Sequence, residues 1–230
     1  GDKMNQNYSK IKYLIFDLDN TIILNEEEDI KTYKDVLKKL NYNVEDYLKI
    51  YDTVDEYESS VSEEELYFTK QGLLEFLNKN LNRNYSIELI DELCDVVGKK
   101  WIRKILLDRK TAEYLASKYK LYIYTNFFGD AQSERIENIG YDKYFKKVFG
   151  PEIYGLKPYR KSIENVLNEI GADPDECLMI GDSKNKEILS ASIVGMKAIL
   201  YDYDGKRDKK DINLDNYIIV KDLKELMKIL

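Results

Sequence analysis

The sequence predicts an α/β protein in which a parallel sheet carries an inserted helical unit, and two observations lead to this prediction. Short apolar runs alternate with helical patterns of about ten residues, an order typical of parallel strands joined by crossover helices. In addition, residues 26–107 show helical spacing throughout and contain no proline. With 230 residues, the chain is long enough to form one or two domains with a sizeable core.

The predicted strands are short and rich in apolar residues, and a helical pattern lies between most of the later ones. Gly140 and Gly171 stand where two of these helices should end. We expect strands at 11–16, 120–124, 146–149, 177–181 and 197–201, with a weaker one at 217–220. We expect helices near 108–119, 130–139, 159–170, 185–194 and 221–230.

The long helical stretch after the first strand has several apolar faces. Ile30, Tyr33 and Val36 lie on one such face, and Leu93 and Val97 lie on another. We therefore predict a separate all-α domain at residues 26–105, inserted into a sheet domain made of residues 1–25 and 106–230. The alternative is that these helices pack directly on one face of the sheet.

Composition excludes several classes of partner. The net charge is −7, with acidic and basic residues mixed and no basic stripe, so we expect no nucleic-acid partner. No apolar run approaches the roughly 18 to 20 residues that cross a bilayer, and the start shows no secretory pattern, so we expect no membrane partner. Cys94 and Cys177 fall in predicted buried elements, which suits reduced core residues and a cytoplasmic location.

Histidine is absent from the sequence, and this excludes much enzyme chemistry. A Ser-His-Asp triad, a Cys-His pair and an H-E-x-x-H zinc site are all impossible. Two distant cysteines also exclude a structural zinc cluster. The reactive groups that remain are carboxylates, lysines, hydroxyls and a bound hard metal ion.

Two aspartates follow directly on the first predicted strand. Asp17 and Asp19 are two residues apart at the carboxyl end of that strand, where open α/β sheets bind ligands. Two like charges this close need a cation or a shared proton to offset their repulsion. We therefore predict a metal site with one carboxylate left to act as a nucleophile. An EF-hand loop starting at Asp17 would place Glu28 twelfth, but Ile22 replaces its required glycine and no helix precedes it.

Polar groups also follow two later segments. Thr125 closes the strand at 120–124 and can present a hydroxyl to an anion, although a threonine here is most often an ordinary cap. Pro158 forces Lys157 into an extended conformation, which can aim its ammonium group inward. The alternative for this lysine is an ordinary surface position.

Asp182 follows the strand at 177–181, and Glu187 lies five residues further on. An N-cap for the next helix is the alternative use of Asp182. Residues 202–205 and the lysines after them are predicted to form a solvated turn. Together, the strand ends supply a nucleophile pair, a hydroxyl, a cation and an acid, which is what phosphoryl transfer requires.

These four motifs, in this order and spacing, resemble those of the haloacid dehalogenase superfamily of phosphohydrolases. The resemblance covers about residues 11–25 and 105–230. It implies a Rossmann-like, doubly wound parallel sheet as the catalytic core, with an inserted all-α helical cap domain of the C1 type. It further implies that Asp17 attacks phosphorus, and that Asp19 is the general acid for the leaving group and then the base for water.

The same resemblance assigns roles to the other motif residues. Thr125, its neighbour Asn126 and Lys157 are implied to bind the phosphoryl group. Magnesium is implied at the Asp17 carboxylate, the Asp19 backbone carbonyl and Asp182. Glu187 is a departure, because the family pattern usually has aspartate there; it either reaches the metal through water or orients Lys157.

The predicted function is a Mg²⁺-dependent phosphatase that hydrolyses a small phosphorylated metabolite, such as a nucleotide 5′-monophosphate or a sugar phosphate, through an aspartyl-phosphate. Two alternatives stay open: a phosphomutase of the same superfamily, and a catalytically silent binding protein. The sequence specifies neither the physiological substrate nor the oligomeric state. Tyrosines of the insertion either stack on a substrate base or sugar or, for most of them, pack in its core: Tyr47, Tyr51, Tyr57 and Tyr67.

Overall fold

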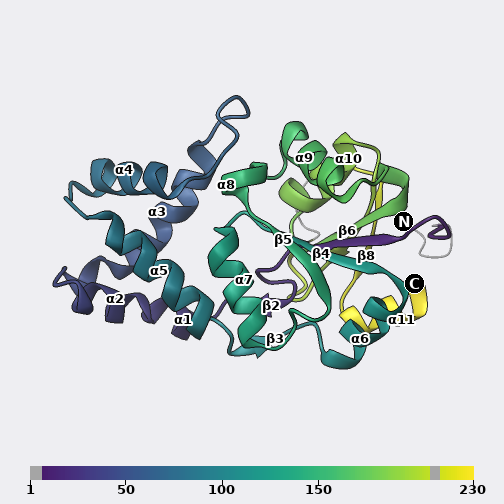
Figure 1. Ribbon diagram of the computed structural model, residues 1–230, viewed down its shortest axis with the longest axis horizontal. Helices are drawn as coiled ribbons and strands as arrows, with labels where there is room; N and C mark the ends of the chain where they lie inside the picture. Colours follow the sequence, from purple (N-terminus) through teal and green to yellow (C-terminus); the bar gives the residue numbers. More distant parts are fainter. Residues whose placement is uncertain (1–6, 208–212) are drawn as a thin grey trace.

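The computed structural model describes residues 7–207 and 213–230. Figure 1 shows two parts: a twisted sheet flanked by helices, and a group of helices beside it on the left. The C-terminus and the first described residues, in purple, lie on the side of the sheet away from these helices. This arrangement confirms the predicted α/β fold with a helical insertion.

The main sheet has six strands, which all run parallel and follow the order β5-β4-β1-β6-β7-β8. β1 is central, and the chain winds outward from it in both directions, so β4 and β6 are its neighbours. The loops after these three strands therefore meet at the switch point where open α/β sheets bind ligands. The strands are β1 (Tyr13–Phe16), β4 (Lys120–Tyr124), β5 (Phe145–Phe149), β6 (Cys177–Gly181), β7 (Lys197–Tyr201) and β8 (Tyr217–Val220).

Both faces of the sheet are covered, which explains why its strands are apolar at successive positions. In β1, Leu14 and Phe16 contribute to the core on one face and Ile15 to the core on the other, and all three are fully buried. The first face is covered by α6 (Arg109–Lys118), α7 (Gly129–Asn138) and α11 (Leu226–Ile229). The second is covered by α9 (Arg160–Ile170) and α10 (Leu189–Ile193).

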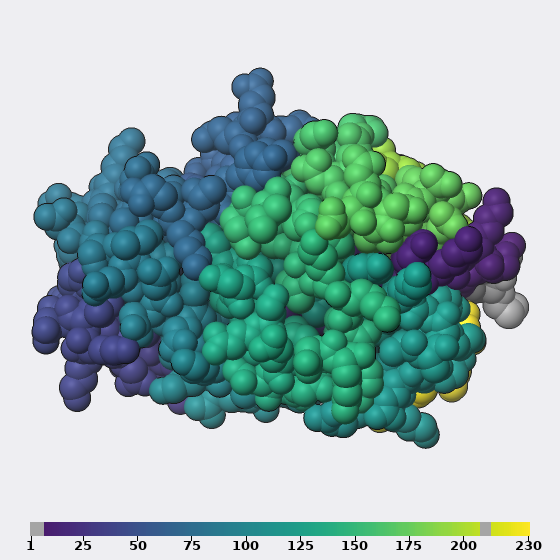
Figure 2. Space-filling view, viewed as in Figure 1, coloured from purple at the N-terminus to yellow at the C-terminus, as the bar shows by residue number. Residues whose placement is uncertain are grey.

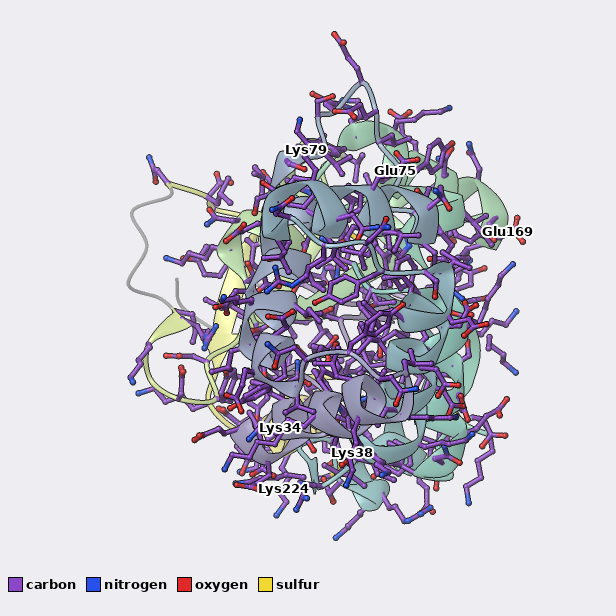
Figure 3. All side chains as sticks on the ribbon, turned by 90° about the vertical axis from the view of Figure 1, so that its left-hand side faces the viewer. Lys34, Lys38, Glu75, Lys79, Glu169 and Lys224 are labelled. Carbon is purple, nitrogen blue, oxygen red and sulfur yellow. The ribbon has the colours of Figure 1, made fainter. Side chains whose placement is uncertain are left out.

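The inserted helices have an apolar core of their own, which includes Leu37, Ile50 and Leu77. Their outer surface is polar: Figure 3 views this end of the molecule, where Lys38 and Glu75 are exposed. This contrast between a buried and a charged side explains the helical spacing in the sequence. The elements are α1 (Glu27–Lys31), α2 (Tyr33–Lys39), η2 (Val44–Asp46), α3 (Tyr47–Ser60), α4 (Lys70–Leu81) and α5 (Ile87–Lys100).

The two linkers between the sheet part and the insertion run side by side. They pair as short antiparallel strands, β2 (Ile23–Leu24) and β3 (Lys104–Ile105), with Ile23 opposite Ile105. The insertion also packs on the sheet part through α5 and α7, with Phe128 and Ala131 joining its apolar core; Figure 2 shows the two parts in contact. The residue boundaries given above for the domains stay a prediction.

Smaller elements complete the chain. Cys94 and Cys177 are both buried and free, as the sequence predicted. No helix within residues 7–207 and 213–230 is long and apolar enough to cross a membrane. The remaining elements are α8 (Pro151–Tyr154), η3 (Pro174–Glu176), η6 (Leu223–Glu225) and a π-helical turn, η4 (Lys184–Ile188).

Candidate active site

A cavity of about 370 Å³ lies between the carboxyl edge of the sheet and the inserted helices. Its wall on the insertion side is mainly apolar and aromatic, with contributions from Tyr33, Tyr51, Val54, Phe68 and Trp101. Its wall on the sheet side contains all seven residues that the sequence pointed to: Asp17, Asp19, Thr125, Asn126, Lys157, Asp182 and Glu187.

Asp17 and Lys157 form a buried ion pair at the base of the cavity. Asp17 directly follows β1 and donates its backbone N–H to the Ile180 carbonyl at 2.9 Å, so the central strands fix its position. The Lys157 ammonium lies 2.9 Å from Asp17 Oδ1 and also donates to the Tyr124 carbonyl at 2.7 Å. Only 3% of Lys157 is exposed, so this lysine is not a surface residue.

Asp17, Asp182 and Glu187 form a cluster in which one carboxylate oxygen from each lies within 4.8 Å of the others. Asp182 follows β6, and the π-helical turn η4 brings Glu187 back beneath the same strand end. Gly181 makes this approach possible, since a Cβ there would lie 2.3 Å from Glu187 Cγ. The Glu187 carboxylate is buried and makes no hydrogen bond, and its Oε2 lies 3.5 Å from the Lys157 ammonium, the same cation that pairs with Asp17.

The charges in this cluster shift its pKa values in opposite directions. Burial alone would raise the pKa of Asp17, but the charge of the Lys157 ammonium holds it below its usual range. Burial and the Asp17 charge raise the pKa of Asp182 to about 10 and that of Glu187 to about 8. Burial would lower the pKa of Lys157, yet Asp17 and Glu187 keep it above its usual value.

This donor set fits a hard divalent cation. Magnesium and calcium prefer carboxylate and carbonyl oxygens, and three carboxyl groups converge here. Asp17 and Glu187 share one ammonium, that of Lys157, and this shortage of positive charge favours a bound cation over a purely structural cluster. A direct contribution from Asp19 through its backbone carbonyl stays a prediction.

Asp19 lies in the same cavity but has different partners. Its Oδ1 is paired with the fully buried Arg135 guanidinium, and its Oδ2 accepts a hydrogen bond from Gln132 Nε2 at 2.7 Å. Both partners are on α7 and three residues apart, so they share one helix face. Sequence reasoning missed both residues, because α7 is polar around much of its circumference and no motif distinguishes them.

Thr125 ends β4 with only 1% of its surface exposed. Its hydroxyl oxygen accepts hydrogen bonds from the Phe127 N–H at 3.2 Å and from Gln132 Nε2 at 3.0 Å. These two hydrogen bonds use both acceptor positions of the hydroxyl, and donation of its proton to a bound phosphate stays a prediction.

Asn126 is engaged in holding the Lys157 backbone. Its Oδ1 accepts from the Lys157 N–H at 2.9 Å, and its Nδ2 donates to the Lys157 carbonyl at 3.1 Å. The same amide nitrogen donates at 2.7 Å to Glu58, which comes from α3 of the insertion. Phosphate binding by Asn126 stays a prediction, whereas its contacts in this structure orient Lys157.

The segment predicted to be a solvated turn also reaches the site. Asp202 is 6% exposed and accepts from the Arg207 N–H at 2.8 Å, so this part of the prediction was wrong. Arg207 Nη1 lies 3.4 Å from Asp182 Oδ2 and lines the cavity. Lys209 and Lys210 lie outside the described residues. The buried aspartate at the end of β7 was hidden in the sequence among the polar residues that follow it.

Comparison with known proteins found similar sequences and similar solved structures. The family model described as haloacid dehalogenase-like hydrolase matches residues 11–195. A glyceraldehyde 3-phosphate phosphatase from Methanothermobacter thermautotrophicus is 28% identical over 116 residues, which cover 49% of this chain and 51% of that protein. The chain therefore spans about half the length of this relative. The pyrophosphatase PpaX from Listeria welshimeri is 27% identical over 211 residues, covering 80% of this chain and 83% of that protein.

A solved structure supports the fold over nearly the whole chain. The putative HAD-hydrolase YfnB from Bacillus subtilis, solved bound to magnesium, superimposes with a TM-score of 0.70. It is 19% identical in sequence, and the match covers 95% of this chain and 98% of that one. The likeness at this identity concerns the fold alone. Because the family model matches most of the sequence, this chain belongs to the haloacid dehalogenase-like hydrolases.

Proposed function

We propose that this protein is a Mg²⁺-dependent phosphatase that hydrolyses a small phosphorylated metabolite through an aspartyl-phosphate on Asp17. One observation carries the proposal: the Asp17 carboxylate faces the cavity beside a buried ammonium and within a cluster of three carboxyl groups. Relatives that are a glyceraldehyde 3-phosphate phosphatase and a pyrophosphatase support the same class of reaction.

The charges of the site suit attack on a phosphate group. A carboxylate approaches a dianionic phosphate only if positive charge offsets the repulsion. Lys157 supplies one such charge at the base of the cavity, beside Asp17. Asp17, Asp182 and Glu187 would hold the magnesium ion, which when bound neutralises charge on the phosphoryl oxygens.

Each remaining residue then has a defined task. Thr125 directs its free hydroxyl proton to a phosphoryl oxygen. An Asp17 oxygen forms a bond to phosphorus while the bond to the leaving oxygen breaks, and Asp19 gives its proton to that oxygen. Asp19 then takes a proton from water as the water attacks the phosphorus of the aspartyl-phosphate. The cavity between sheet and insertion limits the access of bulk water during the first step.

The proposal is tested by phosphate release from a generic aryl phosphate. We expect activity with Mg²⁺, loss on adding chelator, and recovery when Mg²⁺ is restored. Asp17→Asn should lower the rate by on the order of 10⁴-fold, since it removes the nucleophile while keeping the side-chain shape. Asp142→Asn, at an exposed position outside the cavity, is the matched control and should leave the rate unchanged.

Activity that survives Asp17→Asn or is indifferent to chelator would contradict this mechanism. Phosphate transfer to a sugar without release to water would instead favour a phosphomutase.

A further inference from the structure

Arg135 connects three segments that are far apart in the sequence. Its side chain is fully buried on α7. One guanidinium nitrogen, Nη1, donates to Asp19; Nη2 donates to Asn25 Oδ1 at 2.7 Å, and Nε donates to the Trp101 carbonyl at 2.5 Å. A single planar group therefore holds the proposed acid and a residue beside each linker.

Asn25 and Trp101 lie next to the two linkers, so these contacts connect Arg135 to both of them. Asn25 follows β2, where the chain leaves the sheet part, and Trp101 follows α5, where the chain returns to it. Asn25 is also tied to the Asp19 loop, because its N–H donates to Asn20 Oδ1 at 3.1 Å. Movement of the insertion on its linkers would therefore change the position of Arg135 or of the loop that carries Asp19.

Stability alone does not account for this arrangement. A buried ion pair is often no more stabilising than apolar residues of the same volume, because desolvating the charges is costly. The guanidinium also donates to Gln132 Oε1 at 3.3 Å, and apart from the Asp19 carboxyl group its acceptors are neutral oxygens. The group that benefits most from a fixed orientation is Asp19, since proton transfer requires hydrogen-bond distance to the leaving oxygen.

We propose that Arg135 is a positioning residue that couples the two linkers of the insertion to the orientation of the Asp19 carboxylate. This inference rests on the proposed function, in which Asp19 protonates the leaving oxygen as the Asp17–phosphorus bond forms. Arg135 contacts neither substrate nor metal in this role. It sets where the proton donor lies when the insertion is seated over the cavity.

The first test uses leaving groups of different acidity. A nitrophenolate leaves with little help from an acid, whereas an alkoxide needs a proton. In Arg135→Gln, we expect kcat/KM to fall no more than about threefold for 4-nitrophenyl phosphate but about 100-fold for an alkyl phosphate. Arg103→Gln is the matched control: Arg103 lies in the second linker, is half exposed and pairs with Asp29 rather than Asp19.

Equal losses for both substrates would overturn the inference, because a general structural role affects both alike. Arg135→Lys is a second variant in case Arg135→Gln does not fold. Lysine keeps the buried charge but lacks the planar group that donates to four partners, so it should show the same dependence on the leaving group.

The second test does not depend on activity. Trp101 is the sole tryptophan of the chain, so its fluorescence reports on the second linker. We expect Asp19→Asn to shift its emission in the wild-type background and to have no effect in the Arg135→Gln or Arg135→Lys background. A shift of the same size in both backgrounds would contradict the coupling.

The two proposals fail in different ways. Wild-type protein that releases no phosphate from either ester would overturn the proposed function, while the fluorescence cycle would still decide whether the linkage exists. Suppose instead that the wild-type protein is active, that Asp17→Asn abolishes this activity, and that both Arg135 variants keep the wild-type dependence on the leaving group. These results would overturn only the proposed coupling through Arg135.

Discussion

The sheet wall of the cavity is mainly charged and polar, whereas the wall formed by the insertion is mainly apolar and aromatic, with Asp55 and Glu58 as its charged residues. Asp17 and Asp182 directly follow β1 and β6, and the pairing of these strands fixes their spacing. Lys157 lies between α8 and α9 and is held by the Asn126 side chain and the Tyr124 carbonyl. On the opposite side, Tyr33 stacks on Trp101 with ring centroids 5.3 Å apart, and Tyr51 lies next to both. This difference leads us to assign phosphorus chemistry to the sheet wall and the fit of the leaving group to the insertion.

The largest effect should come from removing the buried cation of the sheet wall. Lys157→Met keeps the length of the side chain but removes the charge that offsets Asp17, so phosphate release should fall by roughly 10³-fold. Steady-state kinetics with an aryl phosphate measures this. The control is Lys147→Met, which removes an exposed lysine paired with Glu169 and should change little. A loss of less than tenfold in Lys157→Met would remove this lysine from the proposed mechanism.

A smaller effect, also confined to the sheet wall, is expected in the pH dependence of the affinity for magnesium. With the pKa of Glu187 raised to about 8 and that of Asp182 to about 10, both groups hold protons at pH 7 without metal. Magnesium requires the ionised carboxylates, so binding should release protons and its affinity should rise at least about tenfold per unit between pH 6 and 8. Calorimetry in buffers of different ionisation enthalpy measures the released protons.

The same raised pKa values predict how the free energy of unfolding of the metal-free protein changes with pH. The folded state binds more protons than the unfolded state above about pH 4, so these two groups lose stabilising effect as the pH rises toward 10. The lowered pKa of Asp17 acts in the opposite sense, with its contribution lost as the pH falls. Magnesium affinity that does not change between pH 6 and 8 would contradict the assignment of these carboxyl groups.

The smallest effect should arise at the aromatic wall. Tyr51→Ala should raise KM for a phosphate ester with a bulky ring by about three- to tenfold, since an aromatic contact contributes roughly 0.5–1.5 kcal/mol. It should leave kcat and the affinity for magnesium unchanged. Tyr67→Ala is the control, because Tyr67 belongs to the insertion but is 42% exposed and does not line the cavity. A change in kcat alone would argue against separate tasks for the two walls.

The two walls also differ in how well the sequence predicts them. Asp17, Thr125 and Asp182 could be found because each follows a short apolar strand, and parallel strands bring their carboxyl ends together. The position of Glu187 depends on a π-helical turn, which has no clear sequence signal, although glycine at 181 is a physical sign of a close approach. The seven residues do meet in one cavity, and their individual roles stay predictions.

Several features outside the four motifs could not be predicted from the sequence, and each has a physical reason. Gln132 and Arg135 act from a helix whose polar residues are spread around its axis, so periodicity does not mark them. β2 and β3 are two residues long, too short for an alternating pattern to emerge. Tyr51 lines the cavity and Tyr67 does not, although both are tyrosines of one insertion. Tertiary packing decides that difference.

The pairing of β2 with β3 has a consequence for how such a molecule can diversify. Because the chain departs and returns through neighbouring, hydrogen-bonded strands, the two ends of the helical segment are adjacent. A module with adjacent ends can be lengthened, trimmed or exchanged without rethreading the sheet. On our proposal, changes within the inserted helices alter the wall that faces the leaving group, while the strand ends that carry Asp17 and Asp182 keep their spacing.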